Sequence, residues 1–278
     1  MSTKVHNPNQ KGHGFLYGVI AVVVIIVVLI GYVVIHNKKS SDSASDSMYG
    51  NQDNVNFSIT YHDNAVTMRG DKATDTTPQV DLYEDYSCPH CAELAEATDP
   101  DMLKAIDDGK LIVNIRTLNF LDRGTDGHST HAGAAALALA KSGNAKAYWN
   151  FSKFLLAQQN TIYGRYSDDD FANAAKQFGA SDEVVDQIKA GAEHSNFMDV
   201  ATSNSQKLKD ETGQVSSPRV IQNGKDIDVN NWVADAEKGI NYPDGQVPAA
   251  SDSSEASASE ATDASAPESA ASETAAAN

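Results

Sequence analysis

Two short runs in the chain, residues 55–60 and 65–69, alternate between apolar and polar side chains, which is the pattern of half-buried β-strands. Asp63 and Asn64 lie between them, and both residue types favour tight turns, so the two strands are expected to form a hairpin. A third strand-like run, residues 79–85, leads directly into a segment with helical character. The pattern therefore predicts a hairpin followed by a strand that feeds a helix.

The helix after this strand is expected to break or bend at Asp99-Pro100 and to restart beyond it. Residues 91–98 have helical spacing, but Asp99 is a capping residue type and Pro100 suits a first helical turn. A second helix is therefore expected to start there and to run to Gly109. Residues 111–118 then form an apolar run typical of a buried strand. Strand, helix and strand in this order predict parallel strands with a right-handed crossover.

The following segment, from residue 129 to about residue 213, is helical in pattern throughout. Helices are predicted over residues 132–141, 145–159, 168–178, 181–190 and 196–212. Strand character returns at 215–221, and Asn223-Gly224 predicts a hairpin turn into a strand over 225–229 and a last helix over 231–238. Neither α/β part is a complete sheet alone. We therefore expect an α/β fold in which an all-helical insertion interrupts one mixed sheet.

Residues 15–35 are uncharged and almost wholly apolar, long enough to cross the ~30 Å core of a bilayer as a helix. A cleavable signal peptide is the alternative, but its apolar region is usually about 7–15 residues long and ends in small residues. Here the run is longer and Lys38 and Lys39 follow it closely. We therefore expect a transmembrane anchor over 15–35, preceded by a short N-terminal segment, residues 1–14.

Two further segments have the composition of disordered chain. Residues 36–53 are rich in Ser, Asp and Asn, which predicts a flexible linker. Residues 243–278, mostly Ala, Ser and acidic residues, cannot bury enough apolar surface to offset the entropy of ordering, which predicts a disordered tail. The formal net charge of −17 argues against nucleic acid as a partner, because phosphate binding needs clustered Lys and Arg.

Cys88 and Cys91 are the only cysteines of the chain, and they lie at the predicted strand-to-helix turn. A C-x-x-C in this place is typical of a thioredoxin-like redox pair. A cysteine in the first turn of a helix meets unpaired backbone N–H groups and the positive end of the helix dipole, which favour the thiolate. Pro89 suits the first helical position, and His90 is expected to stabilise the Cys88 thiolate further. Cys88 is thus the candidate nucleophile and Cys91 the resolving thiol.

Thiolate stabilisation favours the reduced protein, so the Cys88–Cys91 disulfide becomes more oxidising, and we predict that it is donated to substrates. A purely structural disulfide is one alternative, but so short a loop removes little entropy from the unfolded chain. A zinc site that adds His128 and His131 is the other, but the H-x-x-H spacing is shorter than usual and leaves the residues between the cysteines unexplained. We therefore predict neither a metal nor a bound cofactor.

The chain resembles the DsbA family of thiol-disulfide oxidoreductases over about residues 54–242. The resemblance rests on residues 85–91 (DYSCPHC), 148–151 (YWNF) and 215–220 (VSSPRV). It implies a thioredoxin-like domain in two parts, residues 54–126 and 214–242, around an inserted helical domain, residues 127–213. It also implies that Ser217 and Pro218 form a cis-proline loop opposite the cysteines, where a substrate chain binds. The predicted anchor and tail look most like those of membrane-tethered actinobacterial, MdbA-type, enzymes.

One position departs from the family pattern. Thioredoxin-like folds usually carry a buried acidic residue six positions before the first cysteine, and Leu82 occupies that position here. Glu84 lies on the same strand face by the two-residue period, which makes it a candidate for moving a proton to or from Cys91. A solvated carboxylate at a strand end is the alternative. Asp81 and Asp85 are expected on the opposite face.

These features predict a membrane-bound enzyme that donates the Cys88–Cys91 disulfide to unfolded exported proteins with free cysteines. A thiol pair that must stay oxidised belongs outside the cytosol, so we place the N-terminus inside and the catalytic domain outside. Another protein must reoxidise the pair, and the resemblance implies a membrane oxidase such as DsbB or a vitamin K epoxide reductase homologue. The alternatives are a cell-surface thiol reductase or disulfide isomerase, and a binding module that uses the fold only as a scaffold.

Overall fold

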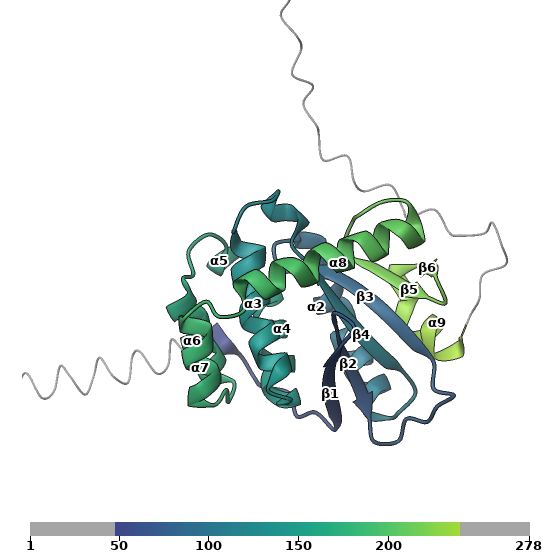
Figure 1. Cartoon of the computed structure of the whole chain (residues 1–278). Coiled ribbons are helices and arrows are strands. Elements are labelled where there is room, and N and C mark those ends of the chain that lie inside the picture. Colours follow the sequence, from purple (N-terminus) through teal and green to yellow (C-terminus); the bar gives the residue numbers. More distant parts are fainter. Residues whose placement is uncertain (1–47, 240–278) are drawn as a thin grey trace, which may run out of the picture. The chain divides into compact units, whose positions relative to one another are not determined.

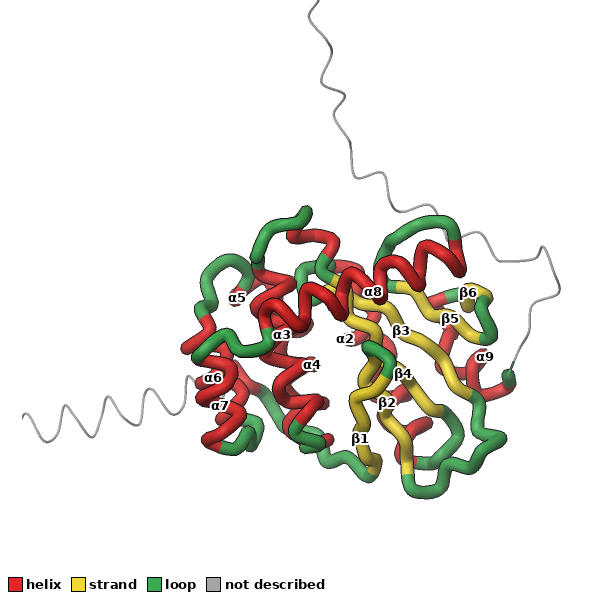
Figure 2. Tube along the Cα trace, in the orientation of Figure 1, coloured by secondary structure: helices red, strands yellow, loops and turns green. Residues whose placement is uncertain are grey.

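A mixed six-stranded sheet with helices on both faces forms the core of the computed structural model, which describes residues 48–239 (Figure 1, Figure 2). The strands are β1 Phe57–His62, β2 Ala65–Gly70, β3 Gln79–Asp85, β4 Ile112–Leu118, β5 Arg219–Gln222 and β6 Lys225–Ile227. Their order is β1-β2-β4-β3-β5-β6; β3 and β4 are parallel, and the other neighbours are antiparallel. The expected hairpin, the parallel strand pair and the single mixed sheet are confirmed.

The two central strands, β3 and β4, are covered on both faces. Leu82 of β3 packs into the main core, whereas Tyr83 points to the opposite face and packs against Leu208 and Ile221. Every residue of β4 is buried, as a parallel strand covered by helices on both sides requires. The turn that carries the cysteines follows the last residue of β3, so it stands at the C-terminal end of a central strand.

The helices are α2 Pro89–Asp107, α3 His128–Lys141, α4 Ala145–Ala157, α5 Gln159–Ile162, α6 Asp168–Gln177, α7 Asp182–Lys189, α8 His194–Thr212 and α9 Trp232–Lys238, with 3-10 turns η1 Phe120–Asp122 and η2 Val229–Asn231. Helices α3 to α7 gather beside the sheet, and α8 runs from them across it (Figure 1). Phe197 and Val200 of α8 pack on α3, while Leu208 nearer its other end packs on Tyr83 of β3. Helix α8 therefore joins the insertion to the sheet.

The predicted helix break at Asp99 and Pro100 was wrong, because α2 continues through both residues. A proline inside a helix removes one backbone hydrogen bond and costs about 3 kcal/mol. Cys91, Met102 and Ile106, on either side of the proline, are all buried in the main core. Burying one large apolar side chain contributes roughly 1.5–3 kcal/mol. Packing along the whole helix therefore outweighs the local preference for a break.

Part of the expected linker is packed against the insertion. The ring centroid of Tyr49 lies 5.2 Å from that of Phe154. The Asp53 carboxylate accepts hydrogen bonds from Trp149 Nε1 at 3.0 Å and from Lys153 Nζ at 2.7 Å. Residues 48–53 are thus tied to α4. A single aromatic residue in a Ser- and Asp-rich segment creates no periodicity, so the pattern did not reveal this contact.

The predicted N-terminal segment 1–14, the predicted anchor 15–35 and the predicted tail 243–278 lie outside the described residues. Within residues 48–239, no helix combines the length and the apolar character needed to cross a membrane.

Gly133 of α3 tests the packing between α3 and α8. A Cβ built at this position would lie 2.0 Å from Cζ of the Phe197 ring, which is far too close for a real contact. Gly133→Ala is therefore expected to lower the free energy of unfolding by about 1–3 kcal/mol, although alanine usually favours a helix over glycine by about 1 kcal/mol. Urea unfolding measures the change. In the double variant Gly133→Ala/Phe197→Leu part of the loss should be recovered, and strictly additive losses would contradict the predicted clash.

Candidate active site

The redox turn, residues 85–91, begins where β3 ends. The Cys88 N–H donates to the Asp85 carbonyl oxygen at 2.9 Å, and the Cys91 N–H donates to the Cys88 carbonyl oxygen at 3.1 Å. Cys88 has extended backbone angles and Pro89 is the first residue of α2. The fixed φ of proline suits this position, and the N–H that proline lacks would have no helical partner. The local sequence thus places Cys88 at the N-terminus of α2.

The carboxylate of Asp85 holds the start of the redox turn. It accepts hydrogen bonds from the Ser129 hydroxyl at 2.6 Å, the Ser87 N–H at 2.9 Å and the Leu121 N–H at 3.2 Å. Burial raises the pKa of Asp85 to about 6, and these hydrogen bonds partly offset the rise. Asp85 therefore connects the turn to α3 and to the segment before it.

Two further side chains of the insertion support the turn, and sequence reasoning missed both. The Gln159 Nε2 group donates to the Tyr86 carbonyl oxygen at 2.6 Å and to the Cys88 carbonyl oxygen at 3.2 Å. The Tyr86 hydroxyl lies 3.1 Å from Ser152 Oγ. No local motif marks Gln159 or Ser152, because each reaches the turn only through the packing of α4 and α5.

The pKa values of the two cysteine thiols are shifted in opposite directions. A hydrogen bond from the Cys91 thiol, together with donors from Ser217 and from the backbone of Cys91 and His90, lowers the pKa of Cys88 to about 6 against the opposing effect of burial. Burial raises the pKa of Cys91 well above its usual value, and Cys88 adds to this rise. In the reduced protein, therefore, the proton leaves Cys88 first, and the Cys91 thiol stays protonated beside the thiolate.

The His90 imidazole makes its hydrogen bond with Glu93. Its Nδ1 lies 3.0 Å from Glu93 Oε2, and the side chain is 55% exposed. This hydrogen bond is the main reason that the pKa of His90 is raised, and the charge of Cys88 contributes less. The backbone N–H of His90, by contrast, is one of the donors to Cys88. His90 thus acts on the sulfur through its backbone and through a longer-range charge.

The Ser217–Pro218 loop reaches the cysteines because β5 pairs with β3, with Arg219 opposite Tyr83. The Ser217–Pro218 peptide bond is cis. Cys88 Sγ lies 3.4 Å from the Ser217 carbonyl oxygen. The Ser217 hydroxyl is buried and, within residues 48–239, has no hydrogen-bond partner while both cysteines are thiols. It is available to donate to Cys88 once the thiolate forms, in agreement with its effect on the pKa of Cys88.

Glu84 is buried and is not a solvated carboxylate at a strand end. Burial raises its pKa to about 8, and the charges of Asp99, Asp85 and Cys88 raise it as well. On the opposite face of β3, the Asp81 carboxylate accepts a hydrogen bond from Arg116 Nε at 2.6 Å. Glu84 is therefore largely protonated at neutral pH, while Asp81 is held by an ion pair.

Asp99 is a second raised carboxyl group that the sequence did not reveal, because its Asp-Pro context pointed to a helix cap. Burial raises the pKa of Asp99 to about 7, Lys153 opposes this rise and Asp53 adds to it. Asp99 and Glu84 line one small cavity together with Met68, Met102, Ile115, Tyr148, Trp149, Ser152, Lys153 and Leu156. The cavity is therefore lined by two carboxyl groups with raised pKa values, Glu84 of β3 and Asp99 of α2 itself.

The two histidines considered as zinc ligands lie in the insertion. Helix α3 begins at His128, whose ring packs against Tyr163 and Phe171. His131 Nδ1 lies 2.7 Å from an Asp168 carboxylate oxygen. In the described part of the chain, neither cysteine belongs to a group of three or more potential metal ligands. The structure does not assemble the four-residue zinc site.

Two thiols of such different acid strength on one helical turn can alternate between dithiol and disulfide. The acidic sulfur exchanges with an incoming thiol, and the buried sulfur closes the ring. The redox turn that carries these thiols joins a central strand of a mixed sheet to a helix, and a cis-proline loop lies opposite it. The fold and the site together define the class of thioredoxin-like thiol-disulfide oxidoreductases.

Comparison with known proteins agrees with this class. A family model described as thioredoxin matches residues 65–241. The MdbA thiol-disulfide oxidoreductase of Corynebacterium diphtheriae is 46% identical, over 68% of this chain and 98% of that chain, with a TM-score of 0.66. The MdbA protein of Corynebacterium matruchotii is 42% identical, over 70% and 98% of the two chains, also with a TM-score of 0.66. Reduced DsbA of Mycobacterium tuberculosis, 22% identical over 66% and 94%, with a TM-score of 0.52, shares the fold.

Among curated proteins, no match is found. The chain belongs to the thioredoxin-like family, in the group of DsbA-like thiol-disulfide oxidoreductases that includes the MdbA proteins. It is a disulfide-forming protein thiol-disulfide oxidoreductase.

The acid strength of Cys88 gives a first test of the site. Ultraviolet absorbance of the thiolate in the reduced protein should follow a single ionisation near pH 6. Ser217→Ala removes a donor to the charged sulfur, and such a bond contributes about 1.5–3 kcal/mol, so the pKa of Cys88 should rise by about one unit or more. Ser216→Ala is the control, because the Ser216 hydroxyl accepts from Arg219 instead. An unchanged pKa in Ser217→Ala would contradict this role.

Glu84→Gln gives a second test, through the pH dependence of stability. The folded-state pKa of Glu84, about 8, lies above the ordinary value of 4.5, so its burial costs nothing below about pH 4 and an increasing amount between pH 4.5 and 8. The stabilising effect of Glu84→Gln should therefore be absent in acid, grow through this window and level off above pH 8. Thermal unfolding across pH measures it. The exposed Glu96→Gln serves as control, and an equal shift of Tm at all pH values would count against the assignment.

Proposed function

We propose that the protein donates the Cys88–Cys91 disulfide to newly exported proteins during their oxidative folding. The observation that carries the proposal is the difference in acid strength between the two thiols, with the pKa of Cys88 lowered to about 6 and that of Cys91 raised by burial. Because an acidic thiol is the better leaving group, a mixed disulfide through Cys88 is readily resolved in favour of the substrate.

In the proposed reaction, a substrate thiolate attacks Cys88 Sγ of the oxidised enzyme. The Cys88–Cys91 bond breaks, a bond between the substrate sulfur and Cys88 forms, and Cys91 leaves and takes up a proton. A second substrate thiolate then attacks the substrate sulfur of the mixed disulfide, and Cys88 leaves as a thiolate. The substrate is oxidised to a disulfide and the enzyme is reduced to the dithiol. Glu84, largely protonated at pH 7, is the proposed source of the proton for Cys91.

The substrate is proposed to bind along the Ser217–Pro218 loop. The loop lies directly against the sulfur, with the Ser217 carbonyl oxygen 3.4 Å from Cys88 Sγ. An extended peptide that pairs with a backbone edge gains main-chain hydrogen bonds without needing a particular sequence. Such binding suits an enzyme whose clients share only unfolded backbone and free cysteines.

The lowered pKa of Cys88 accounts for only part of the redox potential that a disulfide donor needs. At pH 7, a fall of pKa from 9.0 to about 6 favours the reduced enzyme about tenfold, which makes the disulfide about 30 mV more oxidising. The gap between thioredoxin and DsbA is about 150 mV. A donor therefore also needs interactions that favour the dithiol over the disulfide beyond the ionisation itself, because the hydrogen bond from the Cys91 thiol is already included in the lowered pKa of Cys88.

We further propose that the catalytic domain lies outside the cytoplasmic membrane, held by the predicted anchor over residues 15–35, with the N-terminus inside. An oxidising compartment is where a donated disulfide persists. Because Cys88 and Cys91 are the only cysteines of the chain, a second redox protein must reoxidise them. A quinone-linked membrane oxidase, of the DsbB or vitamin K epoxide reductase kind, is the proposed partner.

The redox potential of the full-length protein tests the direction. Equilibration with glutathione, read by alkylation of thiols, should give a potential clearly above that of thioredoxin, about −270 mV, and towards that of DsbA, about −120 mV. A value near −270 mV would identify a reductase and overturn the proposed donor role.

Trapping of mixed disulfides in cells tests the roles of the two thiols separately. Cys91→Ser should accumulate mixed disulfides with exported proteins, because the resolving thiol is missing, whereas Cys88→Ser should accumulate few or none. Equal trapping by both variants would contradict the assignment of Cys88 as nucleophile. A protein that merely binds partners through its surface would show no trapping in either variant.

A further inference from the structure

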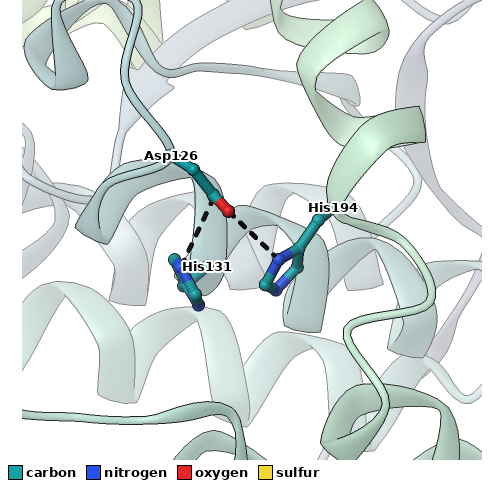
Figure 3. Close-up of side chains that lie close together, drawn as sticks. All are labelled: Asp126, His131 and His194. Atoms are coloured by element: carbon teal, nitrogen blue, oxygen red, sulfur yellow. Dashed lines mark ion pairs between the residues drawn. The ribbon is translucent and has the colours of Figure 1, made fainter.

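A second cluster of reactive side chains lies in the helical insertion, away from the redox turn. Asp126 lies just before α3, His131 is in the first turn of α3, Asp168 is the first residue of α6 and His194 is the first residue of α8. Figure 3 shows Asp126, His131 and His194 converging from these elements. The two imidazole rings are 4.2 Å apart between centroids. Neither the proposed exchange reaction nor the main core uses this cluster.

The hydrogen bonds of Asp168 fix which ring nitrogens carry protons. One Asp168 carboxylate oxygen lies 2.7 Å from His131 Nδ1 and 3.1 Å from His194 Nε2. A carboxylate only accepts, so both of these nitrogens must be donors. In neutral imidazoles the remaining nitrogens, His131 Nε2 and His194 Nδ1, then carry lone pairs. Both lone pairs face the Asp126 carboxylate, at 3.4 Å and 3.6 Å.

Acceptors that face one another in this way need a positive charge between them. A proton on one of the rings is the alternative, but it would draw Asp126 to hydrogen-bond distance of that ring, about 2.7–3.2 Å. The separations of 3.4 Å and 3.6 Å are longer than that. Each separation, one to each oxygen of the Asp126 carboxylate, is close to the spacing of neighbouring ligands around a tetrahedral zinc ion, about 3.3–3.6 Å for bonds of about 2.0–2.2 Å. One ligand atom from each of the three residues lies within 4.8 Å of the other two.

The surroundings of the cluster have the form of a metal site. Asp168 receives the outer N–H of both histidines, which is the carboxylate–histidine–metal arrangement that orients imidazole ligands and increases their basicity. A Cβ at Gly191 would lie 3.3 Å from the His194 ring and 3.4 Å from Asp168, so the backbone at Gly191 closes one side. Asp126 is half-exposed on the other side, which leaves a path for an ion from solvent.

We propose that Asp126, His131 and His194 bind a divalent transition-metal ion of the zinc type, with Asp168 as the positioning residue and water in a fourth position. Two imidazoles and a carboxylate are a donor set that suits zinc. The ligands come from the starts of α3 and α8, which are far apart in the sequence. A bound ion would therefore fasten the insertion that supports the redox turn, and would stabilise the folded state by mass action.

Metal titration of the full-length protein tests the site. The protein is stripped with a chelator and kept in its oxidised form, so that the cysteines are not available as ligands. Isothermal titration with Zn²⁺ is expected to show one equivalent bound, and Tm is expected to rise with Zn²⁺. Asp126→Asn and His194→Gln should each weaken binding more than tenfold, and Asp168→Asn about 10–100-fold. The matched controls Asp169→Asn and His62→Gln, both at exposed positions, should bind as the parent does.

Two results would overturn the proposal: no stoichiometric binding by the parent, or binding that Asp126→Asn and His194→Gln leave unchanged. Unfolding of the chelator-treated variants shows whether they are folded before they are compared. A measurement on the parent alone keeps the test decisive if a variant fails to fold. X-ray absorption of the zinc-loaded oxidised protein should show two imidazole ligands and no sulfur, and any other ligand set would refute the site.

Discussion

The chemistry of this protein depends on one placement, that of Cys88 at the N-terminus of a helix which starts where a central strand ends. The sulfur can then accept a hydrogen bond from the Cys91 thiol one turn further on, and weaker ones from Ser217 and from backbone N–H groups of the first helical turn, which together lower the pKa of Cys88 to about 6. Cys91, one turn further along α2, has no such position and is buried, which raises its pKa. Two cysteines one helical turn apart therefore have pKa values that are shifted in opposite directions.

This placement is held from outside the thioredoxin-like part of the chain. Asp85 is tied to Ser129 of α3, Tyr86 lies against Ser152 of α4, and the turn carbonyls accept from Gln159 of α5. The insertion therefore does more than cover the sheet. It fixes the backbone of the redox turn from three helices, so the rigidity of the insertion bears directly on the geometry around the sulfurs.

Local signals sufficed to predict the strands, the helical insertion and the position of both cysteines, because each depends on residues adjacent in sequence. The same reasoning failed where packing overrides local preference. The local sequence around Pro100 favours a helix start, but buried residues on both sides keep α2 continuous. The same local signal predicts that Asp99 caps a helix, whereas in the structure Asp99 lines the cavity that Glu84 also lines. Gln159 and Tyr49 carry no local signal, and only the tertiary fold gives them partners.

Glu84 and Asp99, the two carboxyl groups that line the small cavity, link proton transfer to the redox state. The pKa of Cys88 is lowered to about 6 and that of Glu84 is raised to about 8, so at neutral pH the sulfur carries a negative charge while Glu84 keeps its proton. That charge is one reason why the pKa of Glu84 is raised. When the disulfide forms, the charge on Cys88 disappears, so the pKa of Glu84 must fall. Reduction reverses the change, and Glu84 holds its proton most firmly in the form of the enzyme that has already given up its disulfide.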